Sequence, residues 1–96
     1  MPQPVPLTFW QARVLLLVTL EPQTVAEVTN RIATRGAILD PARVRQLLEE
    51  LRDLGLLDHK PQAGRAGSRY WLGADPLVER ALDDAYVLVK GGPPRR

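Results

Sequence analysis

The 96-residue sequence predicts a mainly α domain with a small β-hairpin, built as a three-helix core followed by the hairpin and an added C-terminal helix. Three observations favour this class. Signals for the start of a helix recur four times, each ahead of a segment whose apolar residues have helical spacing. Two short apolar segments late in the chain flank a glycine-containing loop, which is typical of a hairpin. Hydrophobic residues make up 45% of the chain, enough for one small core.

The first helix is expected from about residue 9 to residue 20. Thr8 and Gln11 have the spacing of a capping box, in which each side chain bonds a free backbone N–H at the helix start. A proline at position 22 marks its end, because proline cannot continue the hydrogen-bonded ladder. Apolar residues spread around nearly the whole helix. It is therefore either central to the core or buried on a second side by a partner.

The second and third helices have equally clear starts. Thr24 and Glu27 form another capping box and open a helix over 25–34. Asp40 can cap the third helix, and Pro41 follows at the first helical position, where its missing N–H costs nothing. A glycine after this helix suits its end. The expected buried face of the third helix consists of five residues at helical spacing: Val44, Leu47, Leu48, Leu51 and Leu54.

The rest of the chain reads as a hairpin, a helix and a tail. Strands are expected at 56–60 and 69–72, and a fourth helix at 76–90 opens with Asp75 and Pro76. The chain therefore divides into an extended arm (1–7), a core domain with its hairpin (8–74), a C-terminal helix (75–90) and a loose tail (91–96).

Positive charge is concentrated in the hairpin. The formal net charge is only +2, but residues 60–73 carry three cations and no acid. Residues 74–90 instead carry four acids and two cations. A localised basic segment is the pattern expected of a protein that contacts a polyanion.

Several classes of function have no support in the sequence. The chain has no cysteine, which removes disulfides, thiolate catalysis and cysteine-based zinc sites, and its one histidine cannot form a multi-histidine metal site. The glycine-containing stretch at 64–68 lacks the lysine and spacing of a phosphate-binding loop. We expect no enzyme activity, no metal and no cofactor. No apolar run is long enough to span a membrane, and no signal peptide is evident, so we expect a cytoplasmic, nucleoid-associated protein.

Three segments carry a family resemblance: TVAEVTNRI in the second helix, ARVRQLLEELRDLGLL in the third, and HKPQAGRAGSRYWL in the hairpin. Together they resemble a winged helix-turn-helix domain, and the likeness covers about residues 7–90. Within that fold the chain looks most like PadR-type bacterial repressors, with MarR-like and ArsR-like relatives as alternatives. The resemblance implies that the third helix enters the major groove of double-stranded DNA. It also implies that the hairpin, called the wing, lies along the backbone or the minor groove.

The chemistry of the third helix suits that role. Its outward residues in the first two turns are small, basic or amide-bearing: Pro41, Ala42, Arg43, Arg45 and Gln46. Arginine can make two hydrogen bonds to guanine and glutamine two to adenine, and groove-reading helices use their N-terminal half for base edges. The alternative is an ordinary solvated helix face, which every amphipathic helix has.

The wing and the second helix add candidate contacts to phosphate. The wing candidates are Lys60, Arg65, Ser68 and Arg69. Weaker candidates for contact with the DNA backbone are Thr24, Arg31 and Arg35. Cations without neighbouring acids favour phosphate contact over the alternative of a basic loop that has no partner.

The fourth helix has more apolar residues than one thin core needs, which suggests a homodimer. The residues assigned to the dimer interface are Leu77, Val78, Leu82, Ala85 and Val89. The sequence thus predicts a dimeric, sequence-specific DNA-binding protein that acts as a transcriptional regulator, namely a repressor. Two alternatives stay open: a winged-helix protein-interaction module, and the DNA-binding component of a replication, phage or mobile-element system.

Overall fold

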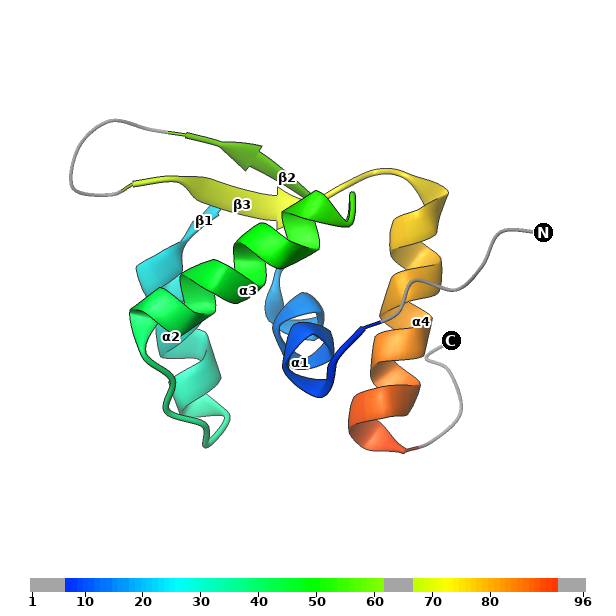
Figure 1. Ribbon diagram of the computed structural model, residues 1–96, viewed down its shortest axis with the longest axis horizontal. Coiled ribbons are helices and arrows are strands. Elements are labelled where there is room, and N and C mark those ends of the chain that lie inside the picture. The colour runs from blue at the N-terminus through cyan, green and yellow to red at the C-terminus, as the bar shows by residue number, and fades with distance from the viewer. Residues whose placement is uncertain (1–6, 62–66, 92–96) are drawn as a thin grey trace.

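The computed structural model describes residues 7–61 and 67–91, and it has the predicted class: four helices and a small antiparallel sheet (Figure 1). In chain order the elements are α1 (Phe9–Leu17), β1 (Gln23–Thr24), α2 (Val25–Thr34), α3 (Pro41–Asp53), β2 (Leu57–Lys60), β3 (Arg69–Leu72) and α4 (Pro76–Lys90). The topology is that of a winged helix-turn-helix domain, in which α2 and α3 form the helix-turn-helix and β2–β3 the wing.

All four predicted helix starts are confirmed. Thr8 and Thr24 each close a capping box with the residue three positions later. The Asp40 carboxylate accepts a hydrogen bond from the backbone N–H of Ala42 at 2.8 Å, and Asp75 does the same for α4. At the other end of α3, Gly55 has φ +81°, a left-handed conformation that residues with a side chain rarely adopt. This turn sends the chain from α3 into the wing.

The sheet differs from the prediction by one strand. The two-residue strand β1 pairs antiparallel with β3, so the strand order is β1-β3-β2. Helix α1 correspondingly ends at Leu17, three residues earlier than expected, because Val18 is already extended. A strand of two residues is too short to show an alternation of apolar and polar residues, so the sequence did not predict β1.

Helix α1 is central to the core, as its apolar circumference suggested. It packs against α2, α3 and α4, and Figure 1 shows α4 on the opposite side of α1 from α2. Its residues Ala12, Val14 and Leu15 are fully buried. From the sheet, Tyr70 is the largest fully buried side chain in the described part of the chain. Burial of α1 from several sides leaves α3 and the wing on the periphery of the fold, where they are accessible.

Candidate nucleic-acid interface

Helix α3 presents a basic surface in its first two turns. Val44, Leu47 and Leu48 are buried against the core, so the residues between them point outward. Arg43 and Arg45 are both exposed, and neither guanidinium group forms a hydrogen bond or an ion pair with any residue that the structure describes. Pro41 and Ala42 are exposed as well, and their small side chains permit the close approach of a partner. All four predicted residues at the helix start are therefore accessible.

The fifth residue, Gln46, is exposed but already bonded. Its Nε2 donates to Glu50 Oε2 at 3.2 Å. The other carboxylate oxygen of Glu50 accepts a hydrogen bond from Gln11 Nε2 on α1 at 2.9 Å. Glu50 is half-buried, and its charge is stabilised by donors from two helices. Gln46 must break its hydrogen bond to Glu50 before its Nε2 group can donate to a base.

The other acid in the middle of α3, Glu49, connects the helix to the wing. The Tyr70 hydroxyl donates a hydrogen bond to Glu49 Oε2, and Arg52 lies 3.3 Å from the other oxygen of the same carboxylate. Burial of the Tyr70 phenol, together with the adjacent Glu49 carboxylate, raises its pKa to about 12. The His59 ring lies against Tyr70 with 4.9 Å between the ring centroids. These contacts set the position of β3 relative to α3.

Two cations face each other across the wing. Lys60 and Arg69 are paired residues on β2 and β3, and like charges in directly opposite positions destabilise a sheet unless an anion is nearby. Glu27 on α2 supplies one, with a carboxylate oxygen 3.6 Å from an Arg69 nitrogen. Hydrogen bonds from Thr24, and then the positive charges of Arg69 and Arg31, lower the pKa of Glu27. One acid against two cations leaves a positive excess at this end of the wing.

The remaining predicted wing residues are less informative. Ser68 is half-buried just ahead of β3. Arg65 lies outside the residues that the structure describes. Figure 1 shows the end of β2, the start of β3 and the N-terminal end of α3 on the same side of the molecule, away from α4. The basic end of the wing and the basic turns of α3 thus lie on the same side of the fold.

The weaker candidates on α2 have other functions in the fold. The Thr24 side chain is nearly buried and accepts the backbone N–H of Glu27 at 3.2 Å. Arg31 Nη1 donates to the carbonyl of Leu17 at 2.7 Å and to Gln23 Oε1 at 3.1 Å, which links α2 to the end of α1 and to β1. Both residues therefore have structural roles in the domain, and their contact with DNA stays a prediction. Arg35 is exposed at the end of α2.

Two of the five residues assigned to a dimer interface lie in the chain's own core. Val78 and Ala85 are buried within the chain's own core, because this face of α4 packs against α1. The other three are half-buried and pack against the same core: Leu77, Leu82 and Val89. The apolar residues that α4 exposes are Val87 and Leu88, at 41% and 45%. These two offer the most exposed apolar surface on α4 for contact with a second chain.

Two features of the surface were not foreseen from the sequence: the Gln11–Glu50–Gln46 chain of hydrogen bonds and the Tyr70–Glu49 bond. Their partners are up to 39 residues apart in the chain. Local spacing carries no signal for such pairs, since only the packing of α1, α3 and β3 brings them together.

The described residues contain no group of three or more His, Cys, Asp or Glu side chains arranged to hold a metal ion. None of the helices in the described ranges is long and apolar enough to cross a membrane.

No protein-family model and no curated protein matches this chain. Among solved structures, it is similar to a mutant of ZitR from Lactococcus lactis, with a TM-score of 0.59 and 22% sequence identity. The similarity covers 88% of this chain but only 52% of the ZitR chain, so the present chain spans about half the length of that protein. The likeness supports the winged-helix fold that the topology shows.

Proposed function

We propose that this protein binds double-stranded DNA in a sequence-specific manner and regulates transcription as a repressor. In this proposal α3 enters the major groove, and the wing contacts the DNA backbone or the minor groove. The observation that carries the proposal is the surface of α3. Arg43 and Arg45 face outward in its first two turns, while the acids Glu49 and Glu50 are bonded within the fold.

The pairing of those acids matters for electrostatics. A free carboxylate on a groove-facing helix would repel phosphate, but Glu49 interacts with Tyr70 and Arg52, and Glu50 with Gln11 and Gln46. Arg52 compensates the charge of Glu49, and hydrogen bonds from the neutral amides of Gln11 and Gln46 hold the Glu50 carboxylate within the fold. The first two turns keep their full positive charge for base edges and phosphates.

Two further points support the proposal. ZitR, to which the fold is similar, is a winged-helix transcriptional regulator. The likeness to PadR-type repressors rests on the sequence, through the wing segment that ends at Leu72 and the added helix α4. A homodimer would place two copies of α3 about one helical turn apart on DNA, so we propose a target made of two half-sites.

The experiment that tests this function is a selection of the purified protein against a random duplex DNA pool at physiological salt, followed by sequencing. We expect an enriched inverted repeat. A variant with both Arg43→Ala and Arg45→Ala serves as the matched control and should enrich no motif, although it keeps the fold. Absence of enrichment with the wild-type protein, or the same motif with the control variant, would rule out base reading by α3.

A further inference from the structure

The side-chain amide of Gln46 is held by a chain of hydrogen bonds that begins at α1. The backbone N–H of Thr8 donates to Gln11 Oε1 at 3.0 Å, as part of the capping box. Gln11 Nε2 then donates to one carboxylate oxygen of Glu50 at 2.9 Å, and Gln46 Nε2 donates to the other at 3.2 Å. The start of α1 is thereby connected to the second turn of α3.

The chemistry of a carboxylate decides which end of each amide faces Glu50. An ionised carboxylate can only accept hydrogen bonds, whereas a glutamine amide has a donor group, Nε2, and an acceptor, Oε1. Gln11 and Gln46 therefore both turn their nitrogen toward Glu50. Gln46 is exposed, and its Oε1 accepts no hydrogen bond from any residue in the described part of the chain. The group that Gln46 presents to a partner is thus an acceptor.

A bond between residues four apart is common on helix surfaces and weak by itself. Two observations set the Gln46–Glu50 pair apart: Glu50 is half-buried, and Gln11, which is 39 residues away in the chain, bonds its other oxygen. If the Gln46 amide turned over, its carbonyl oxygen would face a carboxylate oxygen, and neither of them can donate. The contact between α1 and α3 therefore favours a single orientation of Gln46.

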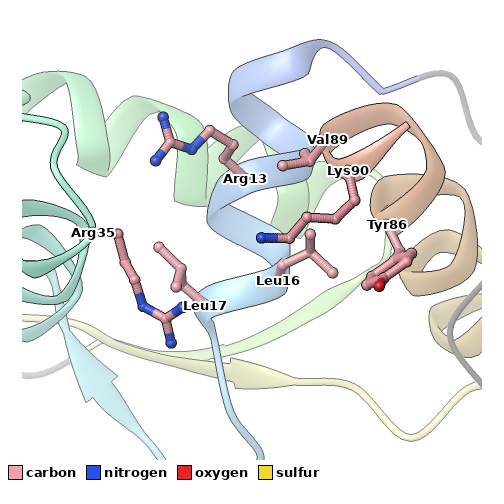
Figure 2. A pocket seen from close by; sticks show the side chains of 7 residues that line it. All are labelled: Arg13, Leu16, Leu17, Arg35, Tyr86, Val89 and Lys90. Carbon is pink, nitrogen blue, oxygen red and sulfur yellow. The ribbon is translucent and has the colours of Figure 1, made fainter. Parts of the chain in front are cut away.

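The cations near α3 do not take the place of these amides. Arg52, two residues after Glu50, pairs with Glu49 and Asp53 instead. Three further cations lie around a pocket formed by α1, the end of α2 and the last turns of α4, to which α3 contributes no residue (Figure 2): Arg13, Arg35 and Lys90. The Glu50 carboxylate is thus bonded by two neutral amides, and it orients both of them.

We infer that Glu50 makes Gln46 select an exocyclic amino group in the major groove, an inference that rests on the proposed function of α3. The amino groups in that groove belong to adenine and cytosine, and both can donate a hydrogen bond to Gln46 Oε1. Guanine and thymine present keto oxygens instead, which are acceptors like Oε1 itself. A glutamine free to turn over would bond either class. Glu50 is accordingly a positioning residue, and Gln46 is the residue that touches the base.

The test begins with selections from a random duplex pool by the wild-type protein and by Gln46→Met, whose side chain has a similar length but no amide. The base position at which the variant loses its preference is the one that Gln46 contacts. Four duplexes that differ only at this position are then titrated with the wild-type protein. We expect adenine or cytosine on the contacted strand to be favoured over guanine and thymine by about fivefold or more. The four affinities also tell the two amino bases apart.

Two variants of equal charge then isolate the effect of Glu50. Glu50→Gln puts an amide of the same shape in place of the carboxylate, so Gln46 can turn over, and the preference should fall to within about twofold. Glu49→Gln removes the same charge from the same helix outside this chain of hydrogen bonds and should keep the preference. In the free, isotope-labelled protein, Glu50→Gln should shift the side-chain amide signals of Gln11 and Gln46, whereas Glu49→Gln should shift neither.

The outcomes separate this inference from the proposed function. If the wild-type protein enriches no motif, base reading by α3 fails, and this inference fails with it. If a motif is enriched but guanine or thymine is preferred at the Gln46 position, only the selection of an amino group is overturned. The same holds if Gln46→Met keeps every preference or if Glu50→Gln keeps the preference for amino bases. An equal loss of preference in Glu49→Gln would trace the effect to charge alone and would also overturn the inference.

Discussion

Tyr70 connects the wing to helix α3 through one hydrogen bond, and this bond can be tested on its own. Its phenol is fully buried and donates to Glu49, a half-buried carboxylate. Tyr70→Phe keeps the ring against His59 but removes the donor. We expect a loss of about 1–3 kcal/mol in the free energy of unfolding, because bonds to charged acceptors are strong and Glu49 keeps only Arg52. Urea denaturation measures this, with Tyr86→Phe as the matched control.

The same bond makes stability depend on pH in the alkaline range. Burial raises the pKa of Tyr70 from its ordinary value of 10.0 to about 12, so the folded state favours the neutral phenol. The stabilisation is complete below pH 10 and is lost as the pH rises toward about 12. The difference in unfolding free energy between Tyr70→Phe and the wild type should therefore become smaller as the pH rises from 10 toward about 12. If Tyr70→Phe is as stable as the wild type at neutral pH, the hydrogen bond from the Tyr70 hydroxyl to Glu49 does not stabilise the contact between the wing and α3.

At the scale of elements, the proposed function implies that α3 and the wing divide the work of binding DNA. In this proposal Arg43 on α3 reads a base edge, whereas Lys60 at the end of β2 contacts phosphate. We expect Arg43→Ala to cost about 1–3 kcal/mol on the selected site and to relax one base position. Lys60→Ala should weaken binding to all sequences by a similar factor and reduce the slope of log affinity against log salt by about one.

The measurement is a titration of both variants on the selected duplex and on a scrambled duplex, at several salt concentrations. Glu79→Ala on α4 serves as a control for charge changes remote from the DNA. If the two variants behave alike on both duplexes, α3 and the wing do not divide specificity and affinity between them.

Elements whose signals are local could be predicted from the sequence. Thr8, Thr24, Asp40 and Asp75 each start a helix through contacts within three residues, and Gly55 ends α3 by its own backbone conformation. Strand β1 exists only because β3 provides its hydrogen-bonding partner. The sequence likewise suggested that Arg31 is a surface cation. Its guanidinium donates a hydrogen bond to a carbonyl of α1, a contact that only the packing of α2 on α1 creates. Patterns that depend on tertiary contacts lie beyond local spacing.

At the scale of the whole molecule, α4 shows the limit of reading an apolar helix from its sequence. The prediction assigned Val78 and Ala85 to a dimer interface, yet both are buried in the core of the same chain, as is Ala81. A central helix as apolar as α1 needs cover on several sides, and α4 supplies part of it. In the described part of the chain, the large apolar side chains that stay exposed on helices are Val87 and Leu88 on α4 and Phe9 at the start of α1, each exposed by 41–46%.

We expect the protein to be a homodimer that uses this exposed apolar surface of α4. Sedimentation equilibrium should give twice the chain mass of 10.7 kDa at micromolar concentrations. A variant with Val87→Glu and Leu88→Glu should sediment as a monomer with an unchanged far-UV spectrum, because neither side chain belongs to the core. A variant with Leu20→Glu is the matched control, since Leu20 is 73% exposed but lies outside the helices.

The dimer also has a consequence for DNA binding that separates it from other assemblies. If α4 joins two chains, the monomeric variant should still contact one half-site through its intact α3, but with much lower affinity, because the second half-site is no longer bound as part of the same complex. Lengthening the spacer of the selected inverted repeat by half a helical turn should weaken the wild-type protein and leave the monomeric variant unaffected. A wild-type protein that sediments as a monomer, or that is insensitive to the spacer, would contradict a two-fold arrangement through α4.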